Sequence, residues 1–127
     1  MAINQDQEDA QELAASVRAA LVGTGAIREV RMFGGIGFML NGNLVAAASR
    51  RGLLLRVGKD NQAEALARSG ARPMVMRGRT MEGYVYVDFP ALNKEAVRNW
   101  LRPAVAYVQT LPQKADRKPK QRRGKRT

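Results

Sequence analysis

The sequence contains no cysteine and no histidine. Without cysteine the chain can form neither disulfides nor a thiolate metal site, which agrees with a reducing compartment. Without histidine it lacks the usual ligand sets for zinc, iron and copper. Catalysis by Ser-His-Asp or Cys-His groups and a histidine pH switch are excluded for the same reason.

Long apolar runs are missing too, and no segment approaches the roughly 20 apolar residues that span a bilayer. The N-terminus, Met1 to Asp6, has no basic region followed by an apolar stretch, so we expect no secretory signal. We therefore predict a soluble, cytoplasmic protein without a membrane partner. The 127 residues, 45% of them hydrophobic, suffice for one domain with its own core.

The net charge of +11 is concentrated at the C-terminus. Residues 112–127 carry eight cations and one acid, whereas residues 1–111 carry 14 and 10. The eight cations are Lys114, Arg117, Lys118, Lys120, Arg122, Arg123, Lys125 and Arg126. The segment has no aromatic or large aliphatic residue and cannot bury enough surface to fold. We predict a folded domain over 1–111 and a disordered basic tail over 112–127.

Apolar residues at helical spacing predict three helices. The first spans about residues 6–22 and ends at Gly23, which accepts a left-handed conformation. For the second, Asn61 is the predicted N-cap, paired with Glu64, and the helix runs to Gly70.

The third helix is predicted to begin after Asn93, its N-cap, with Leu92 and Val97 spaced as a hydrophobic staple. Its apolar face continues to about residue 111. Pro103 lies inside this helix and should bend or split it, because proline removes a backbone hydrogen bond.

Short alternating or apolar runs bounded by turn residues predict five strands. Asn41-Gly42 suits a type I′ turn and predicts a tight hairpin. The strands cover about residues 35–40, 44–49, 53–57, 73–77 and 83–89. The predicted class is α+β, with the order helix, three strands, helix, two strands, helix.

The glycine-rich stretch Gly34-Gly35-Ile36-Gly37 could be mistaken for a phosphate-binding loop. It lacks the Lys-Ser/Thr of a P-loop, does not complete G-x-G-x-x-G, and leads into a strand instead of a helix. We favour glycines that let the backbone bend or approach another element. No cofactor site is predicted.

Residues 82–89 partly resemble an RNA-binding strand whose alternate aromatic residues stack on bases. Glu82 stands where that pattern has a cation, and Val85 where it has a small residue. The predicted order of elements also differs from the RNA-recognition fold. A half-buried strand explains Tyr84 and Tyr86 more simply.

Five methionines, Met32, Met39, Met74, Met76 and Met81, could serve an adaptable binding groove, but we favour gap-filling in a core or subunit interface. The acidic residues are dispersed. Glu82 and Asp88 would lie about 20 Å apart on one strand, too far for paired catalysis. We predict no catalytic or metal-binding residue and a non-enzymatic protein.

The tail has two interpretations. Its cations can simply keep the chain end soluble, or they can neutralise phosphates of DNA or RNA in a salt-sensitive, sequence-independent manner. Without aromatic residues the tail offers no platform for stacking bases. Any nucleic-acid binding by the tail alone is therefore expected to be non-specific.

One stretch, residues 31–44, resembles the N-terminal domain of the TfoX/Sxy family. The shared motif is Met32, Phe33, Gly34 and Gly35, followed by Gly37 and a Gly-containing turn. Further matches are a strand ending in Leu-x-Leu-Arg at residues 53–56 and the segment from Met81 to Pro90. The similarity covers about residues 10–111.

The resemblance implies a two-layer, secretion-chaperone-like fold with helices on one face of a five-stranded antiparallel sheet, often as a homodimer. It also implies kinship with regulators of transformation competence. Those regulators commonly carry a second, helical domain, where this chain has its basic tail. The family supplies no catalytic residues to transfer.

Two hypotheses follow. The first is a regulatory or adaptor domain whose tail tethers it to nucleic acid while the folded part contacts an unidentified protein. The second is a protein-binding module with no nucleic-acid role, which docks through a methionine-rich or sheet surface.

Overall fold

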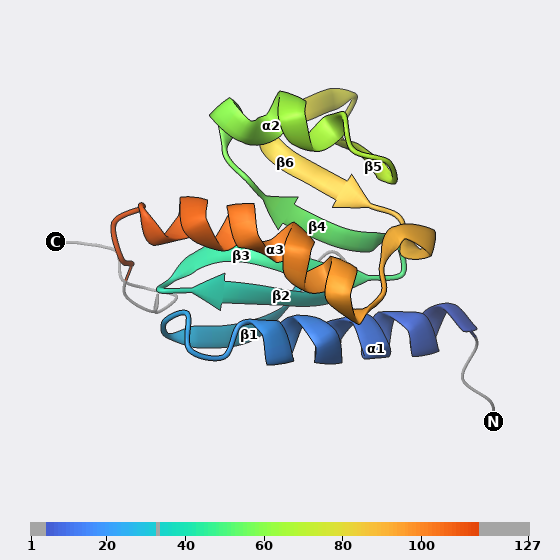
Figure 1. The fold of residues 1–127 in the computed structure, drawn as a ribbon, viewed down its shortest axis with the longest axis horizontal. Coiled ribbons are helices and arrows are strands. Elements are labelled where there is room, and N and C mark those ends of the chain that lie inside the picture. The colour runs from blue at the N-terminus through green and yellow to red at the C-terminus, as the bar shows by residue number, and fades with distance from the viewer. Residues whose placement is uncertain (1–4, 33, 115–127) are drawn as a thin grey trace, which may run out of the picture.

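A computed structural model of the chain describes residues 5–32 and 34–114. These residues form one six-stranded antiparallel sheet and three α-helices (Figure 1). The elements are α1 (Gln5–Ala20), β1 (Ile27–Met32), β2 (Gly35–Leu40), β3 (Asn43–Ser49), β4 (Gly52–Arg56), α2 (Lys59–Leu66), β5 (Ala71–Met76), β6 (Arg79–Val87), the 3-10 turn η1 (Phe89–Ala91) and α3 (Lys94–Gln109). The strand order is β1-β2-β3-β4-β6-β5.

The prediction of five strands was wrong, because β1 precedes the predicted ones and pairs with β2. Its sequence, Ile-Arg-Glu-Val-Arg-Met, exposes Arg28, Glu29 and Arg31. An edge strand with exposed side chains does not need the strict apolar alternation that marks a half-buried strand. The order is therefore helix, four strands, helix, two strands, helix.

All three helices contribute to a single core on one face of the sheet. α1 and α3 lie next to each other over β2, β3 and β4, while α2 packs against β5 and β6 (Figure 1). The core residues of the helices include Leu13, Val17, Ala65, Trp100 and Leu101. They meet alternate residues of the central strands, and the predicted two-layer α+β architecture is confirmed.

Two tight turns join neighbouring strands. Asn41 and Gly42, between β2 and β3, have φ angles of 53° and 85°, as the predicted hairpin requires. Arg77 and Gly78 join β5 to β6 in the same way, with φ angles of 53° and 77°. β6 therefore begins at Arg79, four residues before the predicted start.

The helix caps predicted from the sequence are confirmed only in part. Asn93 caps α3 as predicted, since its Oδ1 accepts a hydrogen bond of 2.8 Å from the amide of Ala96. The predicted cap of α2 was wrong: the helix begins at Lys59, and Asn61 instead donates 3.0 Å back to the carbonyl of Val57. Pro103 does not split α3, which continues to Gln109.

Candidate functional site: the tail exit, the open sheet face and the helical groove

The glycine motif occupies the hairpin between β1 and β2. Gly34 has a φ of 73° in the turn, with open space where a Cβ would lie. At Gly35 a Cβ would collide with the carbonyl of Ala48, and at Gly37 it would collide with the side chain of Met32. Phe33 lies outside the described residues.

These contacts give the motif a packing role. Met32 covers Gly37, and Gly35 allows β2 to approach the end of β3. Since β2 begins at Gly35, no helix N-terminus follows the glycines. The interpretation as close backbone approach is confirmed, and the motif does not form a phosphate loop.

The start of the tail is attached to the turn between β2 and β3. The amide of Lys114 donates 2.9 Å to the carbonyl of Asn41, and the side chain of Asn43 donates 3.0 Å to the carbonyl of Pro112. A Cβ on Gly42 would overlap the carbonyl of Lys114. Residues 112–114 therefore pack against the folded domain, and Lys114 is held at one end of the sheet.

Asn41 also ties this turn to the start of β1. The side-chain Oδ1 of Asn41 accepts a hydrogen bond of 3.0 Å from the main-chain amide of Ala26. The main-chain amide of Asn41 donates a hydrogen bond of 2.8 Å to the carbonyl of Ala26. A shallow cavity of about 320 Å³ lies here, with Arg28 and Lys114 in its wall. Of the eight predicted nucleic-acid-binding residues only Lys114 is described. The other seven, Arg117, Lys118, Lys120, Arg122, Arg123, Lys125 and Arg126, lie outside the described residues.

The sheet face opposite the helices carries a second, smaller apolar cluster. It consists of Ala47, Leu54, Met74 and Tyr86, with Tyr84 and Met81 packed against it. Ala47, Leu54 and Tyr86 each lie between two residues of the main core along their strands, and no helical residue belongs to the cluster. We call this surface the open face. Met74 and Met81 pack in this cluster, in agreement with the predicted gap-filling role, whereas Met76 is 40% exposed.

The tyrosines of the open face lie beneath arginines. Tyr86 is 3% exposed, and the guanidinium of Arg72 lies 4.8 Å from its ring centroid. Arg56 lies 5.9 Å from the ring of Tyr84. Arg72 is held by Asp88 at 2.6 Å, so it covers the ring firmly. The prediction of a half-buried strand is confirmed, and Tyr86 is not available for stacking on a base.

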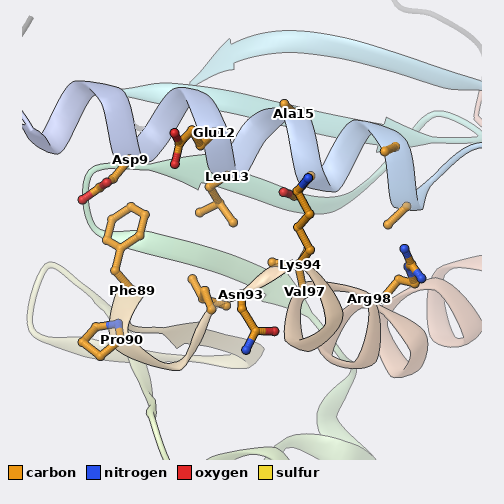
Figure 2. Close-up of a pocket in the computed structure, with 14 residues that line it drawn as sticks. Asp9, Glu12, Leu13, Ala15, Phe89, Pro90, Asn93, Lys94, Val97 and Arg98 are labelled. Carbon is orange, nitrogen blue, oxygen red and sulfur yellow. The ribbon is translucent and has the colours of Figure 1, made fainter.

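A groove of about 990 Å³ lies between α1 and the start of α3 (Figure 2). Leu13 and Val97 point into it, and Phe89 lies at one end. Asp9 and Glu12 lie on the α1 side, whereas Lys94 and Arg98 extend from α3 toward α1. The groove has no local signature in the sequence, because its two walls are about 80 residues apart along the chain and only packing brings them together.

The groove offers apolar contact and charges at its rim. The side chain of Asn93 lines it but already caps α3.

Across residues 5–32 and 34–114, no group of three or more acidic residues could hold a metal ion. Glu82 and Asp88 contact different cations, Lys59 and Arg72.

One exposed ion pair joins α1 to β1. The Nε of Arg18 lies 2.5 Å from Oε2 of Glu29, and its second nitrogen donates 2.8 Å to Oε1. This bidentate hydrogen bonding lowers the pKa of Glu29 below its ordinary value. The carboxylate is thus fixed and ionised beside the exposed edge of the sheet.

The comparisons with known proteins identify one family. The model of the TfoX N-terminal domain matches residues 19–107. No curated protein matches the chain, and no solved structure does. In the described part of the chain, no helix has both the length and the apolar character to cross a membrane.

Proposed function

The chain belongs to the TfoX N-terminal domain family, and we propose that it is a non-enzymatic regulatory or adaptor domain tethered to nucleic acid by its basic tail. The family match covers α3 almost to its end and stops before the tail. This division supports separate roles, with the folded part recognising a protein and the tail supplying attraction to phosphates. A cytoplasmic location, where DNA and RNA are accessible, belongs to the same proposal.

The observation that carries the proposal is the anchored start of a segment with eight cations. Because Pro112 and Lys114 are hydrogen-bonded to the turn between β2 and β3, the cations begin at a fixed place on the domain. With this attachment, non-specific binding of the tail to phosphates keeps the folded domain near a nucleic acid. The tail contacts do not select a particular nucleotide sequence. The link to competence regulation follows from the family alone.

The test is fluorescence polarisation with labelled DNA and RNA duplexes and single strands. The seven cations from Arg117 to Arg126 are replaced by glutamine in the full chain. This replacement is better than truncation at Leu111, which would also remove the contacts of Pro112 and Lys114. If six or more phosphates are contacted, the affinity of the intact chain should fall on the order of 10³-fold between 50 and 200 mM salt.

The matched control replaces Arg77 and Arg79, exposed cations at the hairpin between β5 and β6, with glutamine. This control should bind as the intact chain does, apart from a small loss from its lower net charge. Equal binding by the tail variant and the intact chain would contradict the tether.

The alternative function is a protein-binding module without a nucleic-acid role. The open face favours it, because Met76, two residues after Met74 on β5, is 40% exposed. Apolar side chains at a sheet surface suit a protein partner. Failure of the intact chain to bind any of the DNA and RNA probes at 50 mM salt would favour this alternative.

A further inference from the structure

The strand β1 offers a regular edge for pairing with another strand. In the described sheet it pairs only with β2, through six consecutive residue pairs from Ile27–Leu40 to Met32–Gly35. The opposite edge, β5, contains Pro73 and a register shift between Pro73 and Val75. Proline and bulges protect an edge from pairing, and β1 has neither.

The direction of the backbone groups of β1 follows from one hydrogen bond. The main-chain amide of Asn41 donates to the carbonyl of Ala26, so the backbone N–H and C=O groups of Ala26 point toward β2. In an antiparallel ladder this direction alternates. The even-numbered residues of β1 therefore face β2, and the N–H and C=O groups of Ile27, Glu29 and Arg31 point away from the sheet.

Only a few registers let two copies of this edge pair antiparallel, since outward residues must face outward residues. If Glu29 faced Glu29, two carboxylates would oppose each other, and if Arg31 faced Arg31, two guanidinium groups would. The register between these two places Glu29 opposite Arg31 twice, with Val30 opposite Val30 at the two-fold axis. Opposite charges across a strand pair stabilise it, and like charges destabilise it.

We propose that β1 is a self-association edge, pairing with β1 of a second copy in this Val30-centred register. Two hydrogen bonds from Arg18 orient the carboxylate of Glu29 before it meets Arg31 of the second copy. Arg31 is exposed and has no ion pair within the described residues. A partner strand supplies the missing hydrogen bonds of the backbone and a countercharge for Arg31 at once.

The pairing would join the two sheets into one of twelve strands. It also affects the tails, because Lys114 is held near Ala26, at the start of β1. The two tails would leave from opposite ends of the interface, and both could reach one nucleic acid, which raises avidity. The dimer itself goes beyond the proposed tether, and the variant with the glutamine-substituted tail should still dimerise.

The first test uses the absence of native cysteine. In the Val30-centred register the two Val30 residues form a pair without mutual hydrogen bonds, whose Cα atoms lie about 4.5 Å apart. This spacing allows a disulfide. Val30→Cys in the full chain should therefore give a covalent dimer under mild oxidation, detected by non-reducing electrophoresis and mass spectrometry.

The control is Val75→Cys, on the opposite edge and 53% exposed. It should cross-link far more slowly than Val30→Cys. Equal rates for the two variants, or no covalent dimer of Val30→Cys, would overturn the register.

The second test measures the dimer by sedimentation velocity and does not depend on a cysteine. Arg31→Glu should weaken association about tenfold or more, because it places carboxylates opposite each other twice. Glu29→Arg with Arg31→Glu should restore association, although it removes the pair with Arg18. Arg79→Glu, the same charge change elsewhere on the surface, should have no effect. A chain that stays monomeric up to about 0.5 mM, or a dimer insensitive to Arg31→Glu, would overturn the proposal.

Discussion

The side-chain amide of Asn43 donates a hydrogen bond of 3.0 Å to the main-chain carbonyl of Pro112, 69 residues further along the chain. Asn43 is 3% exposed and is one of two buried polar residues in the described part of the protein. A buried amide requires a partner, and here the partner is the segment that leads into the basic tail. The contact therefore links the core of the sheet to the position from which the tail leaves.

Asn43→Ala should lower the free energy of unfolding by about 1–2 kcal/mol, because it removes a buried hydrogen bond. It should also accelerate hydrogen exchange at the amide of Lys114, whose bond to Asn41 lies in the same turn. Urea unfolding and amide exchange measure the two effects. Gln113→Ala, at an exposed neighbour, should change neither. Unaltered exchange at Lys114 in the Asn43 variant would show that this hydrogen bond does not hold the segment.

The three described glycines of the family motif should differ in their sensitivity to alanine. Gly35→Ala should cost about 3 kcal/mol, because the new methyl group meets the backbone of β3 at Ala48. Gly37→Ala should cost about 1 kcal/mol, because the flexible side chain of Met32 can move away. Gly34→Ala has space but a φ of 73°, which also costs about 1 kcal/mol.

Thermal and urea denaturation of the three variants give this ranking. The double variant Met32→Ala with Gly37→Ala should be more stable than the sum of the two single changes predicts, since Met32 is the group that Gly37→Ala displaces. Additive costs would contradict the contact between Met32 and Gly37.

The pair of Arg18 and Glu29 should contribute to stability in a pH-dependent manner. Because hydrogen bonding lowers the pKa of Glu29 in the folded state, its contribution is present at neutral pH and is lost below about pH 4. The pair is exposed, so Glu29→Gln should cost only about 0.5 kcal/mol at pH 7 and almost nothing at pH 3. Urea unfolding of dilute protein at both pH values measures this difference. Glu64→Gln, on the exposed side of α2, is the control and should show no comparable pH-dependent loss.

Arg68, just after α2, should protect the single tryptophan. Its guanidinium carbon lies 3.5 Å from the ring centroid of Trp100, which is 3% exposed. Arg68→Ala should shift tryptophan emission to longer wavelength and lower stability by about 1 kcal/mol, through lost cation–π contact and lost cover. Arg102→Ala, exposed on α3, should leave the emission unchanged. An unshifted spectrum of Arg68→Ala would show that other groups exclude water from Trp100.

Local features of the sequence predicted much of the fold. Asn41-Gly42 determines its hairpin because few residues other than asparagine and glycine accept positive φ angles in succession. Asn93 caps α3 through a contact three residues away. The predicted N-cap of α2, Asn61, was wrong because Gly58, at a φ of 88°, occupies the N-cap position and leaves Asn61 inside the helix.

The sequence by itself determined the three helices, the central strands, the exclusion of cysteine and histidine chemistry, and the concentration of positive charge after residue 112. These properties depend on composition and on neighbours within one or two turns. The tertiary structure alone decided that β1 is an edge of the sheet, that Asn43 holds Pro112, and that α1 and α3 enclose a groove. Each of these depends on contacts between distant segments, which a local pattern does not encode.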